Sequence, residues 1–189
     1  MKHSFESLKG HFLIAMPALA QGFFAQSLTY LCDHSENGAM GLVINHPMEV
    51  SLGEILEHLK IEGACSAHQH DPVMAGGPVH TDRGFVLHRA GERDWESTLH
   101  LPDGLALTTS RDILADIAND EGPRDLLVAL GYAGWSAGQL EDELAANTWL
   151  TLPADNGIIF ETPYQKRLDA AAAKLGVDLA LLAPGAGHA

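Results

Sequence analysis

The sequence predicts an α+β fold with a mixed sheet, formed as a single domain over residues 1–189. The first strand-like segments are joined by a hairpin, which makes them antiparallel. A later unit, from Leu126 to Leu152, has the order strand, helix, strand. Helix-start signals precede residue 73 and follow residue 108, so that strands and helices are mixed, and no repeat or linker divides the sequence.

The predicted strands are short apolar segments bounded by turn residues. The first covers residues 12–16, and Pro17 ends it. Residues 27–32 and 41–44 form the hairpin, because Asn37 and Gly38 supply positive φ in the turn between them. Further strands are predicted at 73–74, 84–88, 97–101, 105–108, 126–130 and 149–152.

Capping signals mark the helix starts. Ser51 and Glu54 form a capping box, and the pairs Ser136 with Gln139 and Thr162 with Gln165 repeat the pattern. Ser110 is predicted to cap a helix over 111–119, and Gly176 favours an end of the last helix near residue 175. The tail, about residues 184–189, is predicted to be flexible.

The charge excludes some classes of partner. The 189 residues carry 25 acidic and 11 basic side chains, which gives a net charge of −14 at pH 7. Direct nucleic-acid binding is disfavoured, because it needs a basic surface that neutralises phosphates. Binding to an anionic membrane surface is disfavoured for the same reason, and no run approaches the ~20 apolar residues of a membrane span.

The glycines of residues 126–138 resemble a phosphate-binding loop between a strand and a helix. Their spacing is G-x-x-G-x-x-x-G, whereas a dinucleotide-binding loop has G-x-G-x-x-G. The acidic run 141–143 follows closely and would repel a phosphate. We therefore interpret the segment as a tight turn with close packing of helix on sheet.

Metal-ligand residue types gather in one predicted loop, with Cys65, His68 and His70 close together. A structural zinc site usually takes its ligands from two elements, so a polar surface loop explains this run equally well. We predict no metal and no other cofactor, and metal binding by these three residues stays an open alternative.

The two cysteines, Cys32 and Cys65, are too few for a disulfide framework and indicate free thiols in a reducing cytoplasm. Cys32 ends a predicted strand, and His34 shares its face if the strand continues. A neighbouring imidazolium lowers the pKa of a thiol, so Cys32 is a candidate reactive thiol. A buried, inert thiol is the competing interpretation.

Three polar residues stand out in turn regions. Asp82 and Arg83 lie in a glycine-flanked turn, where an arginine either binds an anion or anchors a loop. Asn45 closes a predicted strand ahead of Pro47, a place where a polar side chain can border a binding site. Turn formation alone is the competing explanation for all three.

Several motifs together resemble the AlgH/YqgE family of bacterial proteins, nearly from end to end. They are HFLIAMP at 11–17, GAMGLVIN at 38–45, GGPV at 76–79, TDRGFVLH at 81–88 and GYAGW at 131–135. The resemblance implies a curled, partly barrel-like and largely antiparallel mixed sheet with flanking helices, in a cytoplasmic protein. It implies no settled activity, so no catalytic residues are assigned.

Within these motifs we predict a binding surface made of Asn45, Asp82, Arg83, Tyr132 and Trp135. The leading hypothesis is a cytoplasmic, non-enzymatic regulator or adaptor that acts through an unidentified protein or small ligand. One alternative is a redox-sensing or thiol-dependent protein that uses Cys32. The other is a transcriptional regulator that contacts DNA directly, which the net charge of −14 disfavours.

Overall fold

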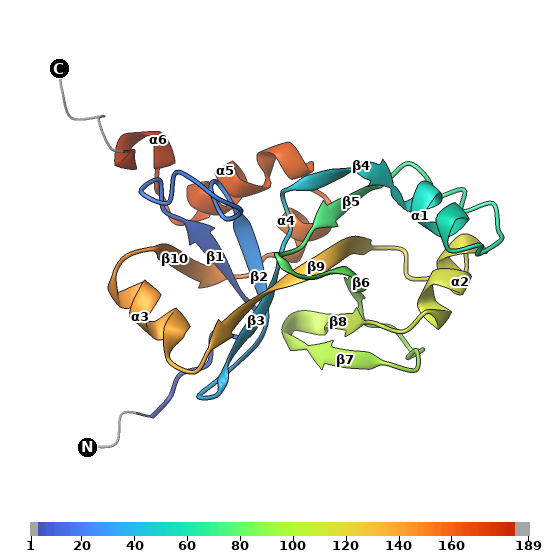
Figure 1. The fold of residues 1–189 in the computed structure, drawn as a ribbon, viewed down its shortest axis with the longest axis horizontal. Coiled ribbons are helices and arrows are strands. Elements are labelled where there is room, and N and C mark those ends of the chain that lie inside the picture. Colours follow the sequence, from blue (N-terminus) through green and yellow to red (C-terminus); the bar gives the residue numbers. More distant parts are fainter. Residues whose placement is uncertain (1–3, 184–189) are drawn as a thin grey trace.

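The computed structural model describes residues 4–183, which form a curled sheet with helices around it (Figure 1). Its main path has the strand order β10-β1-β2-β3-β9-β6-β8-β7, and β4 and β5 join it beside β9. Neighbours on the main path are antiparallel, whereas β5 runs parallel to β9. The predicted α+β class with a mixed, largely antiparallel and curled sheet is confirmed.

The elements have the following bounds. The strands are β1 (His11–Ala15), β2 (Leu28–Ser35), β3 (Gly38–Val43), β4 (Pro47–Ser51), β5 (Pro72–Ala75), β6 (Val79–Arg89), β7 (Thr98–Leu101), β8 (Leu105–Thr108), β9 (Leu126–Ser136) and β10 (Trp149–Pro153). The helices are α1 (Leu52–His58), α2 (Asp112–Ala118), α3 (Gln139–Ala145), α4 (Asn156–Phe160), α5 (Tyr164–Lys174), α6 (Leu179–Leu182) and the 3₁₀ turn η1 (Pro102–Gly104).

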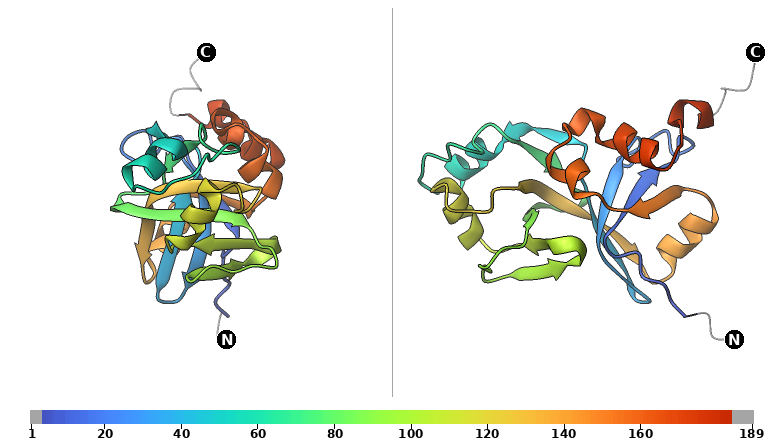
Figure 2. Two further views of the ribbon diagram at one scale, coloured as in Figure 1. Left: turned by 90° about the vertical axis from the view of Figure 1, so that its right-hand side faces the viewer. Right: turned by 180° about the vertical axis from the view of Figure 1, so that it is seen from behind.

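The helices lie at the outside of the sheet. Figures 1 and 2 show α1 and α2 at one end of the molecule, α3 at the other, and α4 to α6 along one long side. The strand β2 is covered on both faces, which explains its nearly continuous apolar run. All of Leu28–Cys32 in β2 is buried.

Three apolar clusters fill the space between these layers. The inner core lies within the curl, with Phe12, Tyr30 and Leu87 among its members. A second cluster packs α1 and α2 against Val86 and Val128. The third lies under α3, around Trp135 and Trp149. Alternate residues of one strand serve different clusters, as the two faces of a pleated strand require.

The segment Gly76–Pro78 carries the chain across β9. Ala129 of β9 pairs with β5 on one side and with β6 on the other. Gly76 still lies on the first side, where its N–H donates to the Leu130 carbonyl at 2.8 Å. Val79 already lies on the second side, opposite Tyr132. Only Gly77 and Pro78 therefore lie between these two points, and they pass over the strand.

This crossing brings backbone against backbone, and only glycine fits it. A Cβ on Gly77 would lie 1.9 Å from the carbonyl carbon of Tyr132, and one on Gly76 would lie 2.4 Å from the Gly131 oxygen. Gly131 itself has φ of +76°, a left-handed conformation that glycine adopts at little cost. The GGPV motif at 76–79 thus has a steric role in the fold.

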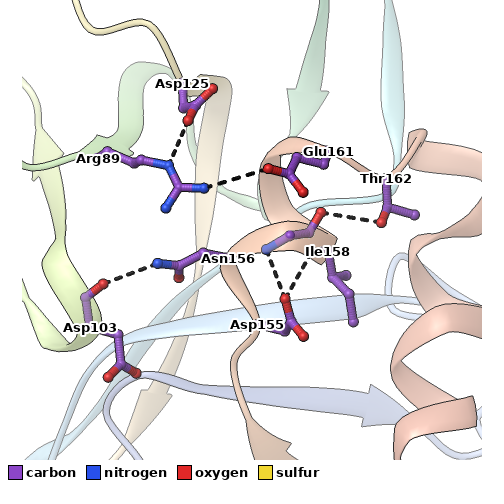
Figure 3. Close-up of polar contacts among 9 residues, drawn as sticks. Arg89, Asp103, Asp125, Asp155, Asn156, Ile158, Glu161 and Thr162 are labelled. Carbon is purple, nitrogen blue, oxygen red and sulfur yellow. Dashed lines mark hydrogen bonds and ion pairs between the residues drawn. The ribbon is translucent and has the colours of Figure 1, made fainter.

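A polar network ties the end of the sheet to α4 (Figure 3). Arg89 Nε at the end of β6 lies 2.5 Å from Asp125 Oδ2, and Asn156 Nδ2 donates to the Asp103 carbonyl at 3.0 Å. Asp155 caps α4 by accepting from the N–H groups of Gly157 and Ile158. Asn156 thereby joins the segment after β10 to η1, and an ion pair between Arg89 and Glu161, with N and O 4.0 Å apart, joins it to β6.

The sequence prediction is right for most strands and wrong around β9. The predicted strand 126–130 continues through Gly131 to Ser136, so the predicted turn is part of a strand. Its left-handed Gly131 changes which face each residue occupies without ending the strand. The segments β4, α4 and α6 were not predicted, and the expected flexible tail at 184–189 lies outside the described residues.

The predicted caps have mixed outcomes. The Ser51–Glu54 capping box forms as predicted, and Gly176, which follows the C-cap residue Leu175 of α5, has φ of +71°. At α3 only the Gln139 side chain contributes, by accepting from the Ser136 N–H. Ser110 and Thr162 do not cap, because their hydroxyls donate to the Asp112 carboxylate and the Gly157 carbonyl. In the hairpin turn Gly38 has positive φ and Asn37 does not.

We expect Gly77→Ala to lower the free energy of unfolding by at least about 3 kcal/mol, because its Cβ forces two backbone segments apart. Urea unfolding followed by circular dichroism measures this change. Gly91→Ala is the matched control, since nothing lies within 4 Å of a Cβ there. It should change stability by less than about 1 kcal/mol. Similar unfolding midpoints for the two variants would contradict the steric role of the crossing.

Candidate functional site

A cleft of about 870 Å³ opens between the ends of β3 and β9 and the strands β6, β7 and β8; we call it the Arg83 cleft. Figure 1 shows the strands that border it, with β9 above, β3 on one side and the β7–β8 hairpin on the other. Its lining comes from five strands and their flanks: Ala39, Met40, Val79, Arg83, Phe85, Glu96, Ser97, Thr98, Leu99, Leu107, Thr109, Tyr132, Gly134 and Trp135.

The floor of the Arg83 cleft is apolar. Met40 and Tyr132 are half-buried and pack against the inner core, and Phe85 and Leu107 belong to that core. Leu99 lies opposite Leu107 in the β7–β8 ladder, yet this residue is 46% exposed. An exposed leucine beside a buried row of apolar side chains marks the uncovered end of the inner core.

Arg83 supplies the positive charge of the cleft. Its guanidinium carbon lies 5.5 Å from the centre of the Phe85 ring, a cation–π contact. Within residues 4–183 it forms no ion pair, whereas Arg89 and Arg93 both do. Tyr132 packs edge-on against the same Phe85 ring, with the ring centres 5.8 Å apart. Arg83 and Tyr132 thus converge on one aromatic side chain, which holds both at the cleft.

Trp135 touches the cleft but is mainly a structural residue. It is 6% exposed, and its Nε1 donates to Glu143 Oε1 at 3.3 Å. Trp149 Nε1 donates to the same oxygen, also at 3.3 Å, and Phe24 packs on both indoles. One carboxylate of α3 therefore holds two tryptophans of the sheet, and Trp135 offers the cleft only part of its surface.

The structure separates the other two residues of the predicted surface from these three. The Asn45 side chain accepts from the Leu28 N–H at 2.8 Å and donates to the Gln26 carbonyl at 2.9 Å. It thereby fixes the start of β2, and it does not line the Arg83 cleft. Asp82 lines a different hollow, of about 530 Å³, together with residues of α1 and α2. The position of Asn45 and Asp82 in predicted turns could not show that their side chains lie outside the Arg83 cleft.

Sequence reasoning missed the residues that complete the cleft. Met40, Phe85 and Leu99 are ordinary apolar strand residues, and only the pairing of distant strands brings them to one place. The lining also includes two hydroxyls, from Ser97 and Thr98, and one carboxylate, from Glu96. Motif spacing gives no signal for such residues. The exposure of Leu99 follows from the place of β7 at the edge of the sheet, which the structure shows.

Cys32 lies in an environment that disfavours a thiolate. It is fully buried in the inner core, and its Sγ lies 3.9 Å from the Tyr30 carbonyl oxygen. Burial, reinforced by the negative charge of Asp33, raises the pKa of this thiol far above its ordinary value. His34 is engaged elsewhere, with its Nε2 2.6 Å from Glu141 Oε1. This geometry argues against the reactive-thiol hypothesis.

The Cys65–Asp71 loop forms a hydrogen-bonded turn. Cys65 is buried with φ of +44°, and its carbonyl accepts from the N–H groups of His68 and Gln69. His68 Nδ1 lies 2.7 Å from Asp71 Oδ2, and this hydrogen bond raises the pKa of the His68 imidazole. Among the described residues, no three His, Cys, Asp or Glu side chains are grouped so that they could hold a metal ion.

A smaller hollow, of about 350 Å³, lies beside α5 and contains Arg167. Burial lowers the pKa of its guanidinium to about 10, so it remains charged at neutral pH. It donates to the carbonyls of Thr162 and Ile44, which ties α5 to the end of β3. Because these bonds engage the guanidinium, Arg167 is a structural clamp, and the Arg83 cleft is the better candidate site.

Across residues 4–183, none of the helices has the length and apolar character that crossing a membrane requires.

We expect Cys32 to react with iodoacetamide at least about 100-fold more slowly in the folded protein than in urea, because it is buried and protonated. The Cys65→Ala variant isolates this thiol, and mass spectrometry at timed intervals measures its alkylation at pH 8. The Cys32→Ala variant reports Cys65 in the same way. Comparable rates for Cys32 in the folded and unfolded protein would restore the reactive-thiol hypothesis.

Comparison with known proteins agrees with the resemblance seen in the motifs. A family model described as AlgH-like matches residues 12–180. The UPF0301 protein AlgH of Pseudomonas aeruginosa is 56% identical over 183 residues, which is 96% of each chain. A UPF0301 protein of Saccharophagus degradans is 55% identical over 185 residues, which is 98% of this chain and 90% of the relative.

Two solved structures share the fold. The solution structure of the P. aeruginosa AlgH protein has a TM-score of 0.79 at 54% identity, with all of both chains covered. A crystal structure of a Corynebacterium diphtheriae protein has a TM-score of 0.76 over 97% of this chain and 95% of that one, and at 17% identity it shows a likeness of fold alone. On its sequence and its curled sheet together, this chain belongs to the AlgH-like family.

Proposed function

We propose that this protein is a cytoplasmic, non-enzymatic regulator or adaptor that binds its partner in the Arg83 cleft. The observation that carries the proposal is the exposed Leu99 side chain, which continues an apolar floor next to a guanidinium with no ion pair among the described residues. An apolar surface bordered by a few polar groups is the usual composition of a binding site.

The side chains of the cleft are suited to binding. They offer one guanidinium, one carboxylate at Glu96, and the hydroxyls of serine, threonine and tyrosine. General acid–base and nucleophilic catalysis rest on a nucleophile held against a base or on paired carboxylates. The groups that line this cleft match hydrogen bonding and charge recognition better than either scheme.

The two alternative functions have less support. DNA binding requires a basic surface, whereas the chain has a net charge of −14 and the cleft has a single arginine. Thiol chemistry at Cys32 requires access and a thiolate, and Cys32 is fully buried with a raised pKa. The hypothesis of a regulator or adaptor, whose partner recognises Arg83 and the apolar floor of the cleft, is the best supported of the three.

Site-specific photo-cross-linking tests the proposal. We expect p-benzoylphenylalanine in place of Leu99 to form adducts in living cells, because any partner in the cleft contacts that position. The matched control carries the same group in place of Leu181, which is 74% exposed on α6. Arg83→Glu should reduce the adducts at least about five-fold, since it inverts the charge of the cleft.

Two results would reject the cleft as the binding site. One is an adduct yield at position 99 no higher than at position 181. The other is an adduct yield that Arg83→Glu leaves unchanged. Circular dichroism and urea unfolding of each variant establish that the fold is intact, so that a lost adduct reports lost binding.

A further inference from the structure

The strand β9 has an open edge along the Arg83 cleft. Its ladder with β3 extends to Ser136, whereas its pairing with β6 ends at Tyr132, opposite Val79. Among residues 4–183 no strand pairs with β9 beyond Tyr132 on the β6 side. Gly134 lies in the middle of this stretch, is exposed, and lines the cleft.

The backbone groups of Gly134 point toward this open side. Hydrogen bonding alternates along an antiparallel strand, so residues two apart face the same neighbour. The Ser136 N–H donates to Gln139 Oε1 at 3.0 Å and therefore faces away from β3. Gly134 must face the same way, which leaves its N–H and C=O available at the edge. Such unpaired edges are templates for an added strand.

The surroundings of this edge suit an extended peptide better than a compact ligand. A strand laid along β9 would direct alternate side chains onto the apolar floor formed by Met40, Tyr132 and Leu99. Gly134 leaves room for it, since even a Cβ there would only reach ordinary contact with the Tyr132 ring, at 3.5 Å. The peptide backbone would supply the hydrogen-bond partners that the edge of β9 lacks.

The charges of the cleft specify the peptide further. Arg83 stands on one wall and attracts a single carboxylate. Glu96 also lines the cleft and, with the net charge of −14, repels a strongly acidic segment. The matching sequence has one acidic residue, apolar residues at alternating positions beside it, and no further negative charge.

We infer that the Arg83 cleft binds an extended peptide segment of a partner protein, which adds as a strand to β9 at Gly134 and places one carboxylate on Arg83. This inference rests on the proposed function and names the class of partner. It differs from small-ligand binding because the main chain of the peptide makes the central contacts.

Selection from a random peptide library displayed on phage, with the full chain as bait, tests the inference. We expect enrichment of peptides that have one acidic residue and apolar residues at alternating positions. In a recovered peptide, N-methylation of single backbone amides should weaken binding about ten-fold at alternating positions and little at those between, because each blocked hydrogen bond is lost. Isothermal titration calorimetry measures the affinities without altering the protein.

Two measurements on the protein locate the contact. Amide hydrogen exchange, measured by NMR on the unmodified protein, should show a slower exchange of the Gly134 N–H when the peptide is bound than when it is absent. Arg83→Gln should weaken binding at least about five-fold for the acidic peptide and leave its Asp→Asn analogue unchanged. Gly91→Ala serves as the matched control and should bind normally, because nothing lies within 4 Å of its Cβ.

The outcomes separate this inference from the proposed function. If no peptide is enriched, or if N-methylation has no alternating effect, strand addition is wrong. If adducts at position 99 nevertheless form in cells and depend on Arg83, the cleft is still the binding site and its partner has another chemistry. If both experiments fail, both proposals are rejected.

Discussion

The contact of the Gly76–Gly77 backbone with β9 determines much of this structure. A Cβ on Gly77 would lie 1.9 Å from the Tyr132 backbone, so any side chain there would push the segment off the strand. Because the chain crosses at this point, β5 and β6 lie on opposite sides of β9. The same crossing ends the β6 ladder at Tyr132, and the free edge at Gly134 follows from it.

Much of the fold could be predicted from local sequence, because the signals are local. Apolar runs bounded by turn residues located most strands, and the Ser51–Glu54 pair located the start of α1. The prediction failed at β9 because glycine usually ends a strand, whereas Gly131 is held within one by the chain that crosses it. A short helix such as α4 has no periodicity over its five residues and depends on contacts with η1 and β6.

The candidate site was predictable only in part, for a related reason. Arg83 and Tyr132 were identified as polar and aromatic residues in distinctive motifs, and pairing of β6 with β9 brings them to one cleft. Asn45 had the same kind of signal, yet its side chain completes the backbone hydrogen bonds around Leu28. Leu99 had no signal of this kind, because its exposure depends on where the sheet ends and not on its neighbours in sequence.

The two indoles that share Glu143 place a source of intrinsic fluorescence beside the Arg83 cleft. The chain has three tryptophans, and two of them, Trp135 and Trp149, donate to one carboxylate oxygen. Trp135 also borders the cleft, so a change in water or charge there alters the electric field at an indole whose other side is fixed by a carboxylate. We therefore expect the intrinsic fluorescence of the unmodified protein to change when the cleft is occupied, which would report binding without a label.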